Sequence, residues 1–242
     1  MIYNHIKSTL LLVILIIALP CIGQNTYNLS GGVDAPLLYG GAIGLGISIP
    51  INKKIDPLTP EQIEALDPYN INPLERVATK SFSHKSRKIS DYFLRLSPVL
   101  PLGLLADSSS RNEFGTVSIM YLETSMVTFG INELSKVLAR RTRPFVYNRS
   151  VGNKEKMKRD ARKSFFSGHT SHVAATSFFT AKVWTDMNPN GKYNSVYWAT
   201  AATIPVITAY LRVKGGKHFP TDVLVGYLVG AAVGILVPEL HK

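Results

Sequence analysis

Basic and histidine residues recur in three short motifs in the second half of this chain. The motifs are Lys136-x6-Arg143-Pro144, Ser167-Gly168-His169 and Arg212-x5-His218-x3-Asp222. A catalyst that attacks a phosphate ester must neutralise the charge on the phosphate oxygens, supply a nucleophile and protonate the leaving oxygen. The residue types in the motifs meet these needs, and the order of the motifs predicts one phosphate-handling site.

Three fixed cations in the motifs suit phosphate oxygens. Arg143 and Arg212 each offer a planar fork of donors, while Lys136 acts as a point charge. Ser167 can add a hydroxyl donor, and Gly168 allows the backbone to approach a ligand closely. We therefore expect these five residues to hold a phosphoryl group.

Two histidines remain for the chemical step. The imidazoles of His169 and His218 can each act as a nucleophile or as a general acid near neutral pH. If a helix begins near Pro220, Asp222 lies one turn from His218 and its carboxylate can orient the imidazole ring.

The three motifs resemble those of the type 2 phosphatidic acid phosphatase superfamily, which also includes bacterial acid phosphatases and vanadium haloperoxidases. The resemblance implies that His218 is the nucleophile that forms a phosphohistidine, and that Asp222 orients it. It implies that His169 protonates the leaving group and activates water, with no metal and no cofactor. The phosphate-binding residues that it implies are Lys136, Arg143, Ser167, Gly168 and Arg212.

Two positions depart from the family pattern. Phe166 stands where the family has proline, and Leu211 stands where it has serine before the arginine. Neither position supplies an essential charge, so we expect both departures to affect affinity or substrate range rather than to abolish activity.

Other titratable residues lie outside the motifs. A histidine without such support is more often structural, which is our interpretation of His5, His84, His172 and His241, although His172 could line the same helix face as His169. Glu123 and Glu133 lie inside a long apolar segment, and we interpret both as structural partners within a helix bundle.

Composition narrows the class of protein. The chain has 242 residues, enough for one domain, with a net charge of +11 and one cysteine, Cys21, which excludes an internal disulfide. Residues 139–163 carry an excess of eight positive charges. This patch could bind nucleic acid, but no nucleic-acid motif accompanies it. Anionic lipid headgroups and a phosphorylated substrate explain it better, and a solvated loop remains the plain alternative.

The pattern of apolar segments predicts an all-α fold, a six-helix transmembrane bundle. Residues 1–23 are typical of a signal peptide, or of an uncleaved anchor, and 24–242 would form a single phosphatase domain. Glycines at four-residue spacing, Gly40 with Gly44 and Gly226 with Gly230 and Gly234, predict close helix packing. We expect helices near 35–50, 91–106, 114–138, 169–186, 193–211 and 222–238.

The motifs fall at helix ends that are separated by an even number of crossings, so they would share one membrane face. A cleaved leader followed by a span at 35–50, together with the basic loops, favours a cytoplasmic site. The family resemblance implies a periplasmic site instead. Our prediction is a multi-pass protein of the bacterial inner membrane whose site faces the periplasm.

The leading functional hypothesis is a membrane phosphatase that hydrolyses a lipid phosphomonoester or pyrophosphate. The sequence does not choose among phosphatidate, phosphatidylglycerol phosphate, undecaprenyl pyrophosphate and a lipid A phosphate. The expected partners are the membrane and the phosphorylated lipid, without nucleic acid or an obligate protein partner. The alternatives are a soluble periplasmic acid phosphatase, a vanadate haloperoxidase, and a non-enzymatic lipid-phosphate binder or transporter.

Overall fold

The computed structural model describes residues 25–242, and every regular element in that range is an α-helix or a 3-10 helix. The all-α prediction is therefore confirmed for this part of the chain. The predicted leader at residues 1–23 lies outside the described residues.

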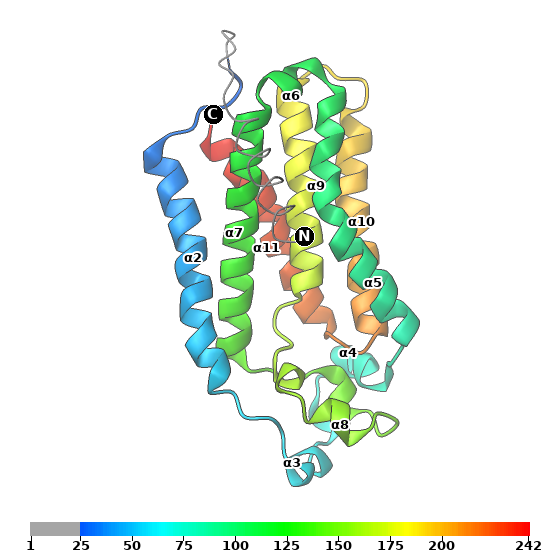
Figure 1. Ribbon diagram of the computed structural model, residues 1–242. Helices are drawn as coiled ribbons and strands as arrows, with labels where there is room; N and C mark the ends of the chain where they lie inside the picture. The colour runs from blue at the N-terminus through cyan, green and yellow to red at the C-terminus, as the bar shows by residue number, and fades with distance from the viewer. Residues whose placement is uncertain (1–24) are drawn as a thin grey trace, which may run out of the picture.

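Long helical segments lie side by side and form the body of the molecule (Figure 1). Each of the predicted segments is helical. The long segments are α2 (Gly31–Lys53), α5 (His84–Leu96) with its continuation η3 (Ser97–Ala106), α7 (Phe114–Ala139), α9 (Gly168–Met187), α10 (Asn194–Lys214) and α11 (Pro220–Leu240).

The predicted helix ends need two corrections. The segment expected at 91–106 begins earlier, at His84, and changes to a 3-10 helix at Ser97. Pro98 and Pro101 in that second part lack the backbone N–H that an α-helix uses, which favours the change. The segment expected at 193–211 continues to Lys214, so Arg212 lies inside α10 rather than after it.

Within residues 25–242, three segments are long and apolar enough to cross a membrane by length and composition, namely Gly31–Lys53, His84–Ala106 and Pro220–Leu240. Their outward faces carry large exposed apolar side chains, including Tyr39 and Ile43 on α2 and Leu224 and Leu228 on α11. Exposed apolar surface of this kind is typical of contact with lipid.

Helix α9 is less apolar than the three candidate membrane spans, and it is covered by neighbouring helices. It packs against α7, α10, α11 and η3, and most of its residues are buried. Most of its serines and threonines are buried, and a buried hydroxyl can bond to a carbonyl one turn back in the same helix, as Thr180 Oγ1 does to Thr176 O.

Glycines set the closest helix contacts. A Cβ added at Gly226, Gly230 or Gly234 would lie 2.7, 2.1 or 2.4 Å from a backbone oxygen of the α9 side, so the predicted packing stripe is confirmed. On α2 the contact residues are Gly41 and Gly44, so the prediction is confirmed for Gly44 but not for Gly40. A Cβ at Gly41 would meet the α7 backbone, whereas one at Gly40 would meet nothing within 4 Å, because the two glycines point in different directions around the helix.

Short elements cover the end of the bundle where α7 finishes and α9 begins (Figure 1). They enclose a small apolar core of Leu58, Ile63, Phe145, Val146, Val151 and Ala161. Thr59 is the N-cap of α3, which is about one turn long, whereas α6 (Ser108–Asn112), capped by Asp107, lies at the opposite end of the bundle (Figure 1). The short elements are α3 (Pro60–Glu64), η1 (Pro68–Asn70), α4 (Pro73–Arg76), η2 (Val77–Lys80), η4 (Pro144–Tyr147), α8 (Asn153–Lys156) and η5 (Arg159–Arg162).

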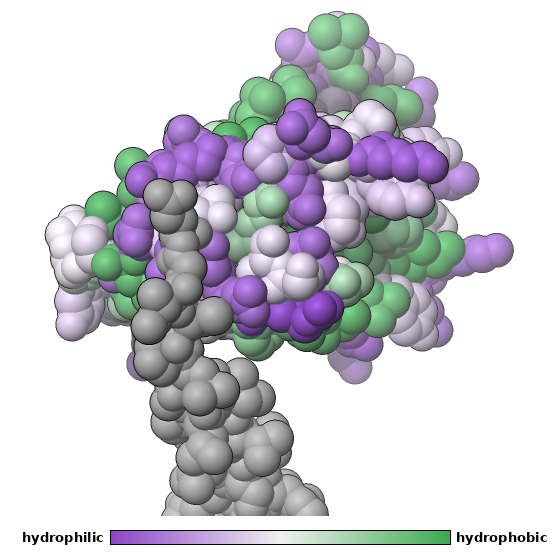
Figure 2. Space-filling view, turned by 90° about the horizontal axis from the view of Figure 1, so that it is seen from above, coloured by the Kyte–Doolittle hydropathy of each residue, from purple (hydrophilic) through white to green (hydrophobic). Residues whose placement is uncertain are grey.

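The opposite end of the bundle holds the start of α2 and the end of α11. Seen from this end, hydrophilic residues gather toward the middle of the face and apolar residues lie mainly toward its edges (Figure 2). Apart from α6, the short elements lie at the other end, where α7 finishes, so the two ends differ in construction (Figure 1).

Candidate active site

Four helix ends bring the three motifs together at the end covered by the short elements. They are the C-terminal ends of α7 and α10 and the N-terminal ends of α9 and α11 (Figure 1). Ser167 N donates to Asp222 O at 2.9 Å and joins the two N-terminal ends directly. Helix N-termini carry partial positive charge and free N–H groups, so two of them side by side favour a bound anion.

His218 is buried, with 1 % of its surface exposed, and both of its ring nitrogens have partners. Its Nδ1 lies 2.7 Å from Ser164 O, and its Nε2 lies 3.1 Å from a guanidinium nitrogen of Arg143. A carbonyl can only accept, so Nδ1 carries the hydrogen. In the neutral ring, Nε2 then holds the lone pair and faces a cation, which is the tautomer that a nucleophilic Nε2 requires.

The charge state of His218 follows from its surroundings. Burial and then the positive charges of Arg143, Arg212 and Lys136 lower the pKa of His218 well below its usual value. The ring is therefore neutral at neutral pH, and three predicted phosphate-binding cations lie close enough to affect it.

Asp222 does not bond to His218 directly, contrary to the expectation from their spacing. Asp222 Oδ2 lies 3.9 Å from His218 Nδ1. The carboxylate instead accepts from Ser164 Oγ at 2.5 Å, from Phe219 N at 2.8 Å and from Arg141 at 2.6 Å. The reason is local, because Asp222 stands in the first turn of α11 and turns its oxygens toward the free backbone N–H at the helix start.

Arg143 is fixed by acceptors on η5 and on the loop between α10 and α11. Its guanidinium donates to Asp160 Oδ1 at 2.9 Å, to Asp160 O at 2.8 Å and to Lys217 O at 2.9 Å. Burial alone would raise the pKa of Asp160, but the charges of Arg143 and Lys217 outweigh it and lower that pKa. Burial, with the charge of Arg143, also lowers the pKa of Lys217 to about 8.

His169 begins α9 and faces a carboxylate from α5. Its Nε2 lies 2.7 Å from Asp91 Oδ1, and the same oxygen lies 3.3 Å from Arg212. Arg212 also donates to Ser90 Oγ at 3.2 Å, and it is buried. Asp91 therefore joins the second and third motifs.

Lys136 lies against the start of α9. A Cβ added at Gly168 would lie 3.0 Å from Lys136 Nζ and 2.6 Å from Asn132 Oδ1, so a larger residue would displace both side chains. Lys136 Nζ pairs with Glu133 Oε1 at 2.7 Å, which brings Glu133 into contact with a motif residue. Ser167 is fully buried and caps α9, with its Oγ 3.0 Å from Thr170 Oγ1.

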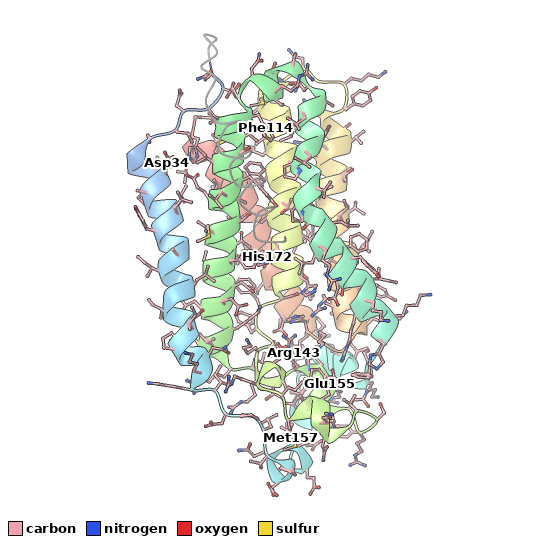
Figure 3. The ribbon with its side chains drawn as sticks, in the orientation of Figure 1. Asp34, Phe114, Arg143, Glu155, Met157 and His172 are labelled. Atoms are coloured by element: carbon pink, nitrogen blue, oxygen red, sulfur yellow. The ribbon has the colours of Figure 1, made fainter. Side chains whose placement is uncertain are left out.

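The neighbouring positions have structural contacts. Phe166 is buried, and its carbonyl accepts from Asn132 Nδ2 at 3.0 Å. His172 donates from Nδ1 to Gly168 O at 2.7 Å, and its ring lies 3.9 Å from that of Phe129. His172 thus lies further along the bundle than Arg143, above the motif-bearing end (Figure 3).

Sequence reasoning did not single out Asp91, Ser164, Arg141 and Asp160 as members of the site. Asp91 lies 78 residues before His169, and Arg141 lies 81 residues before Asp222, so no local spacing connects them. For Asp91 the sequence offered one signal. It is a single carboxylate at the start of an apolar segment, and a carboxylate in such a segment usually has a partner.

Comparison with known protein families assigns this chain to a family. A profile of the PAP2 superfamily matches residues 118–242, which include all three motifs. Lipid A 4'-phosphatase of Porphyromonas gingivalis is 29% identical over 83 residues, which is 34% of this chain and 32% of that protein, so the match spans about a third of that relative's length.

One solved structure is similar across most of its length. It is the transmembrane PAP2-type phosphatidylglycerolphosphate phosphatase of Bacillus subtilis, with a TM-score of 0.47 and 19% sequence identity, over 86% of this chain and 95% of that one. The family assignment rests on the profile, which covers more than half of the chain. This chain belongs to the PAP2 superfamily.

Proposed function

We propose that this chain is an integral membrane phosphatase that hydrolyses a phosphomonoester or pyrophosphate of a lipid. The observation that carries the proposal is the tautomer of His218, whose Nδ1 donates to Ser164 O while Nε2 faces Arg143. A buried neutral imidazole with its lone pair among cations suits attack on a phosphorus atom whose oxygens those cations hold.

In the proposed reaction, His218 Nε2 forms a bond to phosphorus while the bond from phosphorus to the leaving oxygen breaks. His169 gives its proton to that oxygen, and Asp91 at 2.7 Å holds the ring in place. His169 then takes a proton from water, whose oxygen attacks the phosphohistidine. Phosphate leaves, and His218 returns to its starting state.

In this proposal Lys136, Arg143 and Arg212 bind the phosphoryl oxygens, with the α9 start at Ser167 and Gly168. Arg143 and Arg212 are held by carboxylates of other elements, Asp160 and Asp91. Their positions are set before substrate arrives, which makes a cation more effective at stabilising developing charge.

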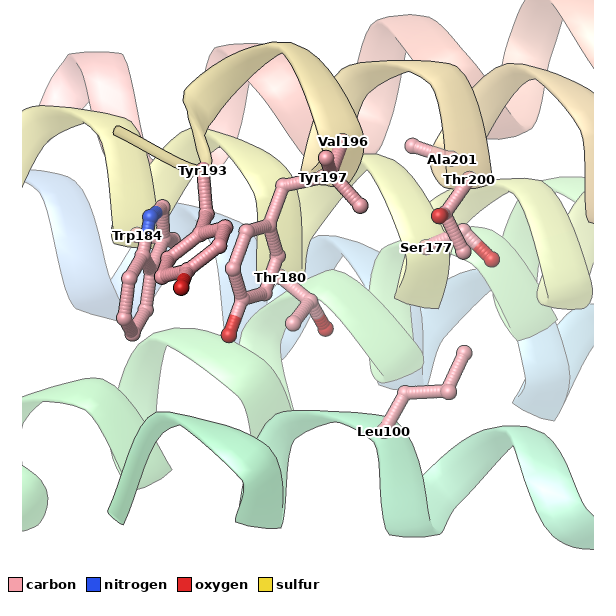
Figure 4. A pocket seen from close by; sticks show the side chains of 9 residues that line it. All are labelled: Leu100, Ser177, Thr180, Trp184, Tyr193, Val196, Tyr197, Thr200 and Ala201. Carbon is pink, nitrogen blue, oxygen red and sulfur yellow. The ribbon is translucent and has the colours of Figure 1, made fainter. Parts of the chain in front are cut away.

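The preference for a lipid rests on the apolar surroundings. A cavity of about 180 Å³ lies between η3, α7 and α9 and is lined in part by His172, one turn of α9 from His169. A wider groove of about 350 Å³ follows α9, α10 and η3, with Leu100, Trp184 and Tyr197 in its wall (Figure 4). The names of the two similar proteins, a lipid A 4'-phosphatase and a phosphatidylglycerolphosphate phosphatase, also support a lipid substrate.

The test is phosphate release in detergent, with EDTA present, from phosphatidate, phosphatidylglycerol phosphate, undecaprenyl pyrophosphate and lipid A, alongside a soluble aryl phosphate. We expect release from at least one lipid, and a loss of about 10³-fold or more in His218→Ala. His84→Ala is the matched control, because His84 is exposed at the start of α5. An acid-labile phosphoryl group trapped on the parent but not on His218→Ala would support the phosphohistidine.

Other outcomes favour the alternatives. Cleavage of the soluble ester alone would favour a non-specific acid phosphatase. Lipid-phosphate binding that is unchanged in His218→Ala, with no turnover by the parent, would favour a binder or transporter. Halide oxidation that depends on vanadate would favour a haloperoxidase.

We further propose that the motif-bearing end faces the periplasm of a bacterial inner membrane. Lys154 is exposed at that end, and Lys192 is exposed in the turn between α9 and α10 at the other end. In a Cys21→Ser background, a membrane-impermeant maleimide should label Lys154→Cys in cells with a permeable outer membrane, and Lys192→Cys only after lysis. The reverse pattern would place the site in the cytoplasm.

A further inference from the structure

Three titratable side chains meet at the end of the bundle opposite the motifs. Asp34 is in the first turn of α2, Glu123 is on α7, and His241 follows the last residue of α11. Figure 3 places Asp34 and Arg143 at opposite ends of the molecule, and Figure 1 places the C-terminus beside the start of α2. The proposed phosphatase chemistry uses none of these three residues.

The three side chains present ligand atoms that lie close together. His241 Nε2 lies 2.9 Å from Asp34 Oδ1 and 3.1 Å from Glu123 Oε2, and the ligand atoms all lie within 4.8 Å of one another. Ligand atoms about 2.1 Å from a zinc ion are separated from each other by roughly 3.0–3.4 Å. The 3.1 Å separation lies within this range, and the 2.9 Å separation lies just below it.

The imidazole of His241 is oriented as that of a metal ligand. Its Nδ1 lies 2.8 Å from Val237 O, a carbonyl that can only accept, so Nδ1 carries a hydrogen. Nε2 therefore meets the carboxylates either as the second N–H of an imidazolium or as a lone pair with a cation between them. A backbone carbonyl that fixes the second nitrogen is the usual support of a histidine ligand.

The charges of Asp34 and Glu123 favour a bound cation between these side chains. One imidazolium N–H would have to serve two carboxylates, and the result would be a buried net negative charge. Glu123 is fully buried, and neither of its carboxylate oxygens has a hydrogen-bond partner within residues 25–242. A buried carboxylate without such partners is costly. A divalent cation with a neutral imidazole would neutralise both carboxylates.

The basic residues nearby are engaged with other carboxylates. Lys182 pairs with Asp186 and Glu239, and Lys242 pairs with the same two carboxylates. Asp34 keeps about a fifth of its side chain exposed, which gives an ion and its water ligands access from solvent.

We propose that Asp34, Glu123 and His241 bind one divalent transition-metal ion of the zinc class. One imidazole and two carboxylates are hard-to-borderline ligands, and among the common ions Zn²⁺ combines high affinity for such sets with a tolerance for three protein ligands plus water. The ion joins the start of α2 to the end of α11 and to α7, so its role is structural and distinct from the phosphate site.

The experiment uses the full chain in detergent, purified without a polyhistidine tag, treated with a chelator and then freed of it. Equilibrium dialysis against ZnCl₂, with metal measured by mass spectrometry, should give about one Zn²⁺ per chain. The Tm of the parent should rise with Zn²⁺, because a ligand that binds only the folded state stabilises it. X-ray absorption should show nitrogen and oxygen ligands at about 2.0–2.1 Å.

Glu123→Gln, His241→Gln and the milder Asp34→Asn should each weaken Zn²⁺ binding at least tenfold and remove the rise in Tm. Glu64→Gln and His84→Gln change the same residue types at exposed positions and should keep both. The proposal is wrong if the parent binds no Zn²⁺ in dialysis, whatever the variants do. It is equally wrong if the three variants bind Zn²⁺ as the parent does, and a plain ion-pair cluster would then explain the contacts.

Discussion

His218 Nδ1 lies 2.7 Å from the carbonyl of Ser164, and the hydroxyl of the same serine donates to Asp222 Oδ2 at 2.5 Å. Ser164 therefore stands between the predicted nucleophile and the carboxylate that the spacing predicts as its direct partner. We therefore expect Asp222 to act on the imidazole through this serine and through the start of α11, where it accepts from Phe219 N.

Removing the hydroxyl of Ser164 tests this relay. In Ser164→Ala the carbonyl still accepts from His218, but its link to Asp222 is lost. We expect kcat to fall about 2- to 12-fold, which corresponds to one net hydrogen bond, with little change in KM. Steady-state kinetics on the best lipid substrate measures the effect. An unchanged kcat would mean that the link to Asp222 does not help to position the ring.

The protonation state of His218 should be unusual across a wide range of pH. Its lowered pKa predicts a neutral ring, protonated at Nδ1, at every pH from neutrality to well below 6.5. Nitrogen-15 NMR of labelled histidines, with His218→Gln to identify the signal, would measure it. A titration midpoint near 6.5 for that signal would contradict the prediction.

The same shift has a consequence for stability. Below a pH of about 6.5 an unfolded His218 binds a proton, whereas the folded residue does not. The unfolded state is therefore favoured as pH falls, and His218 lowers the free energy of unfolding in that range. His218→Gln should lose less stability than the parent between neutral and mildly acidic pH, as measured by thermal unfolding in detergent.

Asp91 is expected to position His169 without touching the phosphoryl group. Asp91→Asn keeps the shape but weakens the contact with the imidazole and with Arg212. We expect kcat to fall about 10- to 100-fold, less than the full value of a general acid. Asp56→Asn is the matched control, because Asp56 is an exposed aspartate at the same end. If Asp91→Asn, Asp56→Asn and the parent have the same kcat, Asp91 does not position His169.

Close packing of α11 on α9 should be sensitive to one methyl group. A Cβ at Gly230 would lie 2.1 Å from Ser171 O, so Gly230→Ala must separate the two helices. We expect a loss of stability of about 1–3 kcal/mol, read as a lower Tm in detergent. Gly40→Ala, on α2, adds its methyl group in open space and should leave Tm unchanged or slightly higher. Similar values for the two variants would contradict the packing argument.

The sequence by itself determined the helical character of this protein and predicted the residues of its candidate site. Apolar patterning predicted helical segments that the structure also has. Residue types, motif spacing and the resemblance to a known family together selected Lys136, Arg143, Ser167, Gly168, His169, Arg212, His218 and Asp222. These features are local, because helix periodicity, capping and motif spacing involve residues close together in the chain.

Only the tertiary structure decided which residues far apart in the sequence come together. Asp91 reaches His169 from another helix, Ser164 comes between His218 and Asp222, and Asp34, Glu123 and His241 meet although 207 residues separate the first from the last. Such contacts depend on how helices pack, and helix packing is set by the glycine stripes and by burial, which act across the fold. The spacing of residues in a motif cannot predict these contacts, because the same local pattern is compatible with many arrangements of distant partners.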